Sequence, residues 1–249
     1  MDINNELKGF FENPLAGEYI SCTDNLVRRS VTGISASCEL LKEMTDRQGG
    51  KAEKELIDGI MTSCCELMRN VELSRVLAGG ASGTEGEFTT VRLDSFLRDL
   101  AVSCGESTGG RCTVRTGELP ASFVRTDREA LSFLLLSFIR RHIIASETGE
   151  ADFEIKCGEN DKKVELKITA SGTFVDFPDM ARPDFFSAYH REVCMGLAER
   201  AGASAELSER ALSVVIPLPD GNSPALLEAP AAEPERGFFN PFSLMLADI

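Results

Sequence analysis

Two long apolar seams, separated by a glycine turn, constrain the fold of this chain more than any other feature. In the segment 22–44, apolar residues recur at alternating spacings of four and three: Val27, Val31, Ile34, Cys38 and Leu41. The segment 51–77 repeats this pattern at Ile57, Ile60, Cys64, Leu67, Val71 and Ser74. A mean spacing near 3.5 residues predicts helices that pack along one stripe, as in coiled coils. Because Gly49-Gly50 stops the first helix, we expect an antiparallel helical hairpin.

A single hairpin of this kind would leave part of its apolar stripe exposed to water. A second copy of the chain would cover the stripe, which predicts a homodimer built on a four-helix bundle. The alternative is that the hairpin packs against the rest of its own chain. The predicted dimer interface consists of Val27, Val31, Ile34, Ile60, Leu67 and Val71.

From Phe88 onward the pattern changes to short, mixed elements. The predicted order is a helix at 93–104, strands at 111–115 and 122–125 around the turn 117–120, a helix at 127–145, strands at 151–157 and 164–168, a helix at 185–200, and strands at 203–207 and 212–218. This order predicts an α/β sandwich with helices on one face of a mixed sheet, so the whole chain is α+β. Asp127 is expected to cap the long helix.

The chain is therefore divided into a leader (1–20), the hairpin (21–80), the sandwich (87–219) and a tail (220–249). The first part of the tail, 220–236, is acidic and proline-rich, which predicts an extended linker. The apolar end of the tail, 238–246, has three interpretations. It docks on its own domain, binds a groove on a partner, or is a frayed terminus.

Composition excludes several classes of function. With 26 basic and 40 acidic residues the net charge is -14, which argues against binding to nucleic acid or anionic lipid. The apolar stretches are too short to span a bilayer, and Asp2 and Glu6 precede any apolar run, so no export signal or membrane insertion is predicted. We expect a cytoplasmic location with the eight cysteines reduced. No cysteine or histidine spacing predicts a metal site.

Several segments match, in order, the landmarks of one family. Residues 25–34 are similar to a phosphoacceptor box, and residues 73–79 to the end of the helix that follows it. Residues 88–100, 127–135 and 215–218 are similar to the connecting strand and first helix, the nucleotide-site helix and the terminal strand of an ATP-binding domain. Together, over residues 20–219, they resemble the cytoplasmic half of a two-component sensor histidine kinase.

The resemblance also implies that the chemistry of the family has been lost. It places Asn25 at the position of the phosphorylated histidine, and a carboxamide is not a nucleophile at neutral pH. The magnesium ligand falls near Arg140, whose guanidinium cannot bind Mg²⁺. The adenine-reading carboxylate is replaced by Ala170, and the glycine-rich lid falls at 188–191, which contains no glycine. The degenerate nucleotide-site positions are Leu136, Arg140, Ala170, Gly172, Phe174 and His190. We therefore expect no nucleotide, metal or other cofactor.

The predicted function is that of a non-catalytic, pseudokinase-like dimer that binds the receiver domain of a response regulator, or another histidine kinase. The resemblance implies a docking surface at Asn25, Arg28, Arg29 and Thr32, where the arginines would suit the acidic site of a receiver domain. One alternative is an active histidine kinase, phosphotransferase or phosphatase with divergent motifs. Another is a small ligand bound in the former nucleotide pocket. His142 is expected at the surface or a helix end, and His190 as a structural residue; neither is expected to replace the phosphoacceptor.

Overall fold

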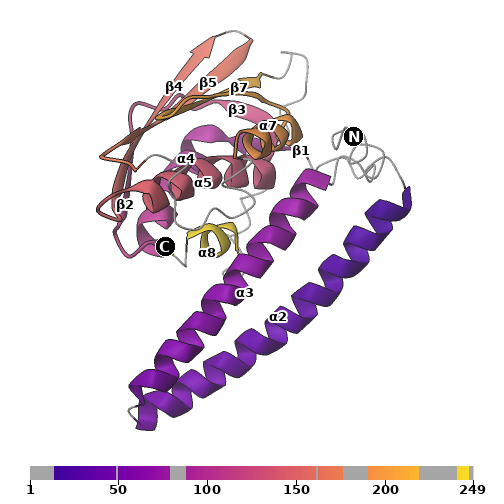
Figure 1. The fold of residues 1–249 in the computed structure, drawn as a ribbon. Helices are drawn as coiled ribbons and strands as arrows, with labels where there is room; N and C mark the ends of the chain where they lie inside the picture. Colours follow the sequence, from indigo (N-terminus) through magenta and orange to yellow (C-terminus); the bar gives the residue numbers. More distant parts are fainter. Residues whose placement is uncertain are drawn as a thin grey trace. The chain divides into compact units, whose positions relative to one another are not determined.

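The computed structural model describes residues 14–48, 50–78, 88–160, 162–175, 190–218, 240–246 and 249. These residues form two compact units, a helical hairpin and an α/β unit (Figure 1). No helix within these ranges is both long and apolar enough to cross a membrane. The predicted linker at 220–236 and the start of the helix predicted from 185 lie outside the described residues.

The hairpin consists of α2 (Pro14–Gln48) and α3 (Lys51–Ala78). The predicted start at residue 22, and with it the leader 1–20, is wrong because α2 begins eight residues earlier, at Pro14. Proline suits the first turn of a helix, where its fixed φ is helical and its missing N–H would have no partner.

Two ion pairs between the helices show how the hairpin is aligned. Arg28 pairs with Glu72, and Lys42 pairs with Asp58 at 2.8 Å. Lys42 follows Arg28 by 14 residues on α2, and Glu72 follows Asp58 by 14 residues on α3. The two ion pairs are therefore two heptads apart on each helix. The antiparallel register is thus maintained over two heptads, as the seam spacing predicted.

The hairpin divides its apolar residues between two faces. Val31, Cys38, Ile57 and Cys64 are buried. Val27 and Val71 are half-buried. In contrast, Ile34, Ile60 and Leu67 keep 44–46% of their surface exposed, and Leu41 keeps 49%. The single seam read from the sequence is therefore two stripes, one inside the hairpin and one on its surface.

The α/β unit is built on a five-stranded mixed sheet in the order β2-β4-β5-β7-β6. Its strands are β2 (Cys112–Thr116), β4 (Ala151–Asn160), β5 (Lys163–Ser171), β6 (Ser204–Leu207) and β7 (Ala211–Pro217). Strands β2 and β4 are parallel, and the other neighbours are antiparallel. A separate two-stranded sheet pairs β1 (Phe88–Arg92) with β3 (Phe123–Asp127).

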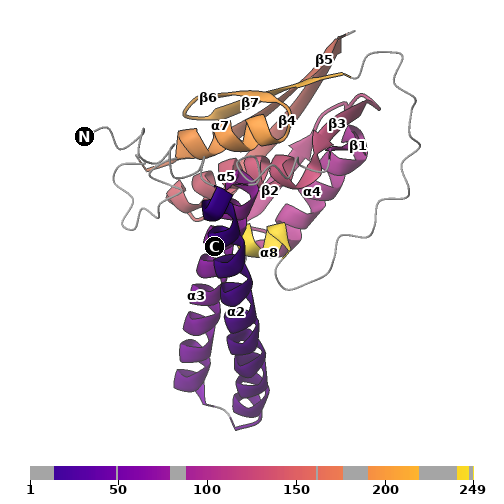
Figure 2. The ribbon, with the colours of Figure 1, turned by 90° about the vertical axis from the view of Figure 1, so that its right-hand side faces the viewer.

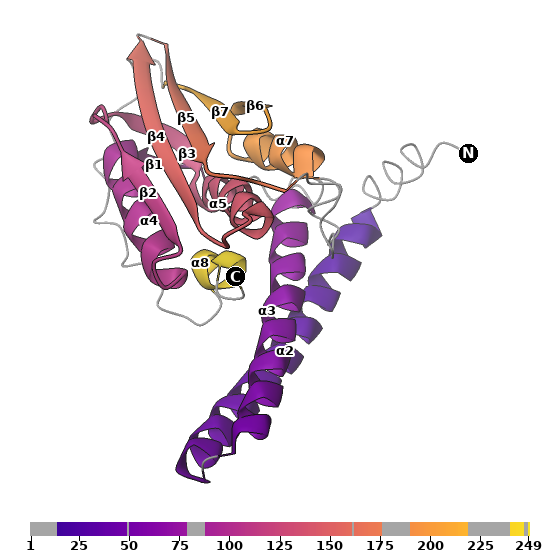
Figure 3. The same cartoon turned by 60° about the vertical axis from the view of Figure 1, so that its left-hand side comes forward.

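The helices of this unit lie on one face of the sheet, as predicted (Figures 1 and 2). They are α4 (Leu93–Ser107), α5 (Arg128–Ala145) and α7 (described from His190 to Arg200). The short helix α8 (Pro241–Leu246) lies against α4 and α5 (Figure 3). The strands around the turn 117–120 do not pair with each other, because β2 joins β4 and β3 joins β1. That choice depends on distant strands and has no local signal.

The cysteines whose side chains the structure describes, from Cys38 to Cys194, are free thiols. All of them except Cys157 are buried, which fits the expectation of small apolar core residues. Burial raises the pKa of the Cys157 thiol to about 11 and that of Cys194 to about 12. These thiols are therefore protonated at neutral pH and poor nucleophiles.

Candidate functional site

Helix α5 forms the centre of the α/β unit and is surrounded on all sides. Almost every residue from Ala130 to Arg140 is buried, so the helix has packing partners all around its circumference. Its start is fixed by Asp127, whose side chain accepts a hydrogen bond from the Ala130 backbone N–H at 3.1 Å. This capping was predicted from the sequence. The Asp127 carboxylate also pairs with Arg200 of α7, at 3.5 Å.

One partner of α5 comes from the far end of the chain. Helix α8 packs on α5 and α4 with Leu244, Met245 and Leu246 buried. Arg140 is only 9% exposed, and its Nη1 donates a 2.7 Å hydrogen bond to the Met245 carbonyl oxygen. The residue that matches the family's magnesium ligand is thus a buried cation bound to the main chain of α8.

The tail segment therefore docks on its own domain, one of the three outcomes considered for it. Its helix begins with a local cap, in which Asn240 Oδ1 accepts from the Ser243 N–H at 2.9 Å. Pro241 follows at the first helical position, which suits proline.

Other positions matched to the nucleotide site are filled by protein atoms. Leu136 is fully buried in α5, and Ala170 is buried in β5 opposite Phe153. Gly172 has a φ of +139°, a backbone conformation that favours glycine, and a Cβ there would lie 3.5 Å from the Phe174 ring. An aromatic ring therefore lies where the family's motif has its second glycine.

Phe174 is held in place by two neighbours. Its ring centroid is 5.1 Å from that of His142, in an edge-on arrangement, and the Arg210 guanidinium lies 5.6 Å from the Phe174 ring centroid. These contacts hold the half-buried ring in place between a buried histidine and an exposed arginine.

His142 lies in the last turn of α5, so it is at a helix end as expected, but the alternative of a surface position is wrong because the side chain is buried. It is 1% exposed, and its ring nitrogens each lie 2.8 Å from a carbonyl oxygen, those of Phe138 and Glu209. Burial lowers the pKa of His142 below its ordinary value, although the two carbonyls oppose this effect.

His190 is the first described residue of α7 and is also buried. Its Nε2 lies 3.7 Å from Cys194 Sγ, one turn along the same helix. A histidine in this position supports helix packing, as expected. Within the described residues, no group of three or more His, Cys, Asp or Glu side chains is placed to hold a metal ion.

One residue of the predicted docking surface on the hairpin, Arg28, belongs to an ion-pair cluster. Glu72 is buried and pairs with Arg28 from α2 and, at 3.0 Å, with Arg75 from α3. Arg28 thus pairs within the hairpin while its side chain keeps 34% of its surface exposed, and its role toward a partner stays a prediction. Arg29 and Thr32 are exposed. Asn25 lies on α2, three residues before Arg28, and its side chain is outside the described residues.

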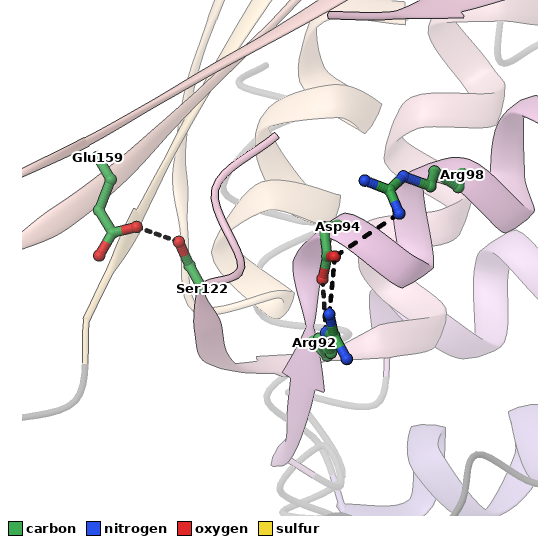
Figure 4. Close-up of polar contacts among 5 residues, drawn as sticks. All are labelled: Arg92, Asp94, Arg98, Ser122 and Glu159. Carbon is green, nitrogen blue, oxygen red and sulfur yellow. Dashed lines mark hydrogen bonds and ion pairs between the residues drawn. The ribbon is translucent and has the colours of Figure 1, made fainter. Parts of the chain in front are cut away.

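A second polar cluster, at the junction of β1 and α4, was not identified from the sequence (Figure 4). The Asp94 carboxylate is buried and accepts two hydrogen bonds from Arg92, at 2.8 and 3.1 Å. Arg98 lies 4.0 Å away on the next turn. The hydrogen bond from Arg92 lowers the pKa of Asp94, although burial opposes it. The only local signal was the spacing Arg-x-Asp-x-x-x-Arg at a strand–helix boundary.

Ser122 connects this junction to the main sheet (Figure 4). Its hydroxyl donates to Glu159 of β4, and its carbonyl accepts from the Leu93 N–H at 2.9 Å. These contacts position the small sheet and α4 against the large sheet, and they form a structural cluster.

Solved structures with the same fold come from histidine kinases. The crystal structure of full-length ShkA in complex with AMPPNP matches with a TM-score of 0.55 and 15% identity, over 80% of this chain and 45% of ShkA. Acinetobacter baumannii histidine kinase AdeS matches with a TM-score of 0.51 and 13% identity, over 76% of this chain and 96% of AdeS. No protein-family model and no curated protein matches the sequence.

These comparisons confirm the predicted fold, a helical hairpin followed by an α/β sandwich of the histidine-kinase type. This chain spans less than half the length of ShkA. At 13–15% identity, the likeness shows the fold and leaves the activity to be argued from the residues.

Proposed function

We infer that this chain is a non-catalytic, histidine-kinase-like signalling protein that acts by binding a response-regulator receiver domain or another histidine kinase. The observation that carries the proposal is Arg140, a buried cation hydrogen-bonded to a main-chain carbonyl at the position matched to the magnesium ligand. Magnesium needs oxygen ligands, and a fixed positive charge would repel it. The proposal keeps the cytoplasmic location expected from the sequence.

The phosphoryl-transfer step has no acceptor at the matched position either. Asn25 replaces the histidine in the phosphoacceptor-like segment, and its carboxamide nitrogen has no nucleophilic lone pair at neutral pH. The loss of the acceptor and the loss of the metal ligand occur in separate units of the chain. One substitution alone could be compensated, whereas two independent losses support a scaffold without catalysis.

The exposed stripe of the hairpin supports dimerisation as part of this proposal. Ile34, Ile60 and Leu67 form an apolar face in a single hairpin. A second hairpin packed on this face would complete a four-helix bundle and remove the stripe from water.

For the partner, the proposal rests on the surface near Asn25, with Arg29 and Thr32 exposed. Arg28 contributes indirectly, because its pair with Glu72 fixes the helix that carries Arg29. The test is binding of the purified chain to a panel of receiver domains. Arg29→Glu should weaken the interaction, and the control Lys51→Glu, at the opposite end of the hairpin, should leave it unchanged.

The test of lost catalysis uses the full chain with ATP and Mg²⁺. We expect no change in melting temperature with millimolar nucleotide, because a ligand that binds the native state must stabilise it. Incubation with γ-labelled ATP should leave no acid-labile phosphate on the protein. A magnesium-dependent thermal shift, or stable labelling, would instead support the alternative of an active kinase or phosphotransferase.

A further inference from the structure

We propose that the face formed by α4 and α5 is a binding site for a short apolar helix, and that its ligand is the chain's own segment 240–246. This inference concerns a peptide site and does not depend on whether the hairpin binds a receiver domain. The proposed peptide site lies on the face that carries Arg140, the residue that the resemblance matches to the magnesium ligand.

The apolar part of the site is complementary to the segment. Helix α5 has almost no exposed residue between Ala130 and Arg140, although the sheet covers only one of its sides. On α4, the buried residues include Phe96, Leu97, Leu100 and Cys104. Helix α8 packs against both helices and brings Leu244, Met245 and Leu246, each at most 2% exposed. Without the segment, the parts of α4 and α5 that α8 contacts would be exposed to water.

The polar part of the site recognises the end of the short helix. The last carbonyls of a helix have no partner within it, and cations near them are favourable. Arg140 supplies such a cation and donates to the Met245 carbonyl oxygen at 2.7 Å. This hydrogen bond gives the buried Met245 carbonyl a partner and satisfies one N–H of the buried guanidinium, and such polar groups are costly to bury without a partner.

The segment 240–246 forms a separate short helix, as expected of a peptide that binds the face of α4 and α5. It forms its own cap at Asn240 and therefore does not rely on a preceding helix. In the sequence, residues 219–239 lie between the segment and the last strand of the sheet. The hydrogen bond from Arg140 to a main-chain carbonyl recognises the C-terminal end of the short helix. The three buried apolar side chains of the segment make the site specific for its amino-acid sequence.

The experiment uses the full chain with a protease recognition sequence introduced within 223–232. After cleavage, native mass spectrometry measures whether the C-terminal fragment remains bound to the body of the protein. We expect the fragment to be retained. In Arg140→Gln it should dissociate at least tenfold faster. The matched control is Arg141→Gln, since Arg141 lies next to Arg140 in sequence but near Cys194 of α7.

Fragment exchange keeps the test valid even if Arg140→Gln fails to fold. A labelled peptide of residues 237–249 should replace the fragment in the cleaved, otherwise unaltered protein, and the same peptide carrying Leu244→Asp should not. Immediate loss of the fragment, or equal uptake of both peptides, would overturn the proposed site. Release of the fragment by Mg²⁺ and ATP would support a site on this face while contradicting the proposed lack of nucleotide binding.

Discussion

The guanidinium of Arg140 donates a 2.7 Å hydrogen bond to the carbonyl oxygen of Met245, a residue 105 positions later in the chain. This contact joins the central helix of the α/β unit to its last helix. The hydrogen bond gives a buried N–H and a buried carbonyl oxygen a partner each, so it links the position of Arg140 to that of α8.

Helix α8 should contribute to the stability of the α/β unit. Leu244→Ala removes buried methyl groups from the contact with α4 and α5 and should lower the free energy of unfolding by about 2–5 kcal/mol. Chemical denaturation measures the change. The control Ser243→Ala, at a half-buried position of the same helix, should change it by less than about 0.5 kcal/mol. Equal effects of the two substitutions would show that α8 is not held as described.

The exposed stripe of the hairpin should mediate dimerisation. Ile60→Asp places a charge on this stripe and should yield monomers, because burying an unpaired carboxylate in an interface costs several kcal/mol. Ile60 is 44% exposed in the single hairpin, so the hairpin itself should stay folded. Light scattering gives the mass and circular dichroism the helix content. Thr62→Asp, on another side of α3, should leave the mass unchanged.

The ion-pair cluster at the β1–α4 junction should be a stabilising element. Asp94→Asn weakens two charge-assisted hydrogen bonds from Arg92 and should lower the free energy of unfolding by about 1–3 kcal/mol. The control Asp152→Asn removes a carboxylate that is 54% exposed and 3.9 Å from Arg115, and should have almost no effect.

The stabilisation that Asp94 provides should depend on pH, and the Asp94→Asn variant tests this. The pKa of Asp94 is lower in the folded protein than its ordinary value of 3.8. The stabilisation is therefore complete above pH 3.8 and is lost as the pH falls through the folded pKa. The difference in stability between the wild type and Asp94→Asn should shrink over that range. A constant difference would mean that the carboxylate charge is not the cause.

His142 should make the protein less stable in mild acid. Its pKa is lowered by burial, and the charges of Arg141 and Arg210 act in the same direction. Because the unfolded chain binds the proton more readily, stability should fall as the pH drops below about 6.5, by at most about 1.4 kcal/mol per pH unit. Denaturation at pH 7.5 and 5.5 tests this. His142→Gln should show a smaller loss between the two pH values.

Much of the fold could be predicted because its signals are local. The spacing around Val31 and Ile57 gave the two helices and their antiparallel order, and Asp127 identified the start of α5. The alternation of apolar and polar residues in β4 and β5 located both strands, although the turn is tighter than expected, with Asn160 paired to Lys163. Capping, glycine stops and side-chain periodicity depend on residues close in sequence, so they can be read without a structure.

Contacts between distant residues decided the rest. The spacing of apolar residues by three and four does not distinguish Val31, which is buried, from Ile34, which is exposed. The sequence around His142 gave no indication that Glu209, 67 residues later, would lie beside its ring. The sequence left open whether the tail docks at all, and the answer depends on an apolar face shared by α4 and α5 and on Arg140 within it. The sequence alone therefore determined most of the elements and their order, though not helix α8. Tertiary structure decided which faces are covered, because burial depends on the side chains that distant parts of the chain bring together.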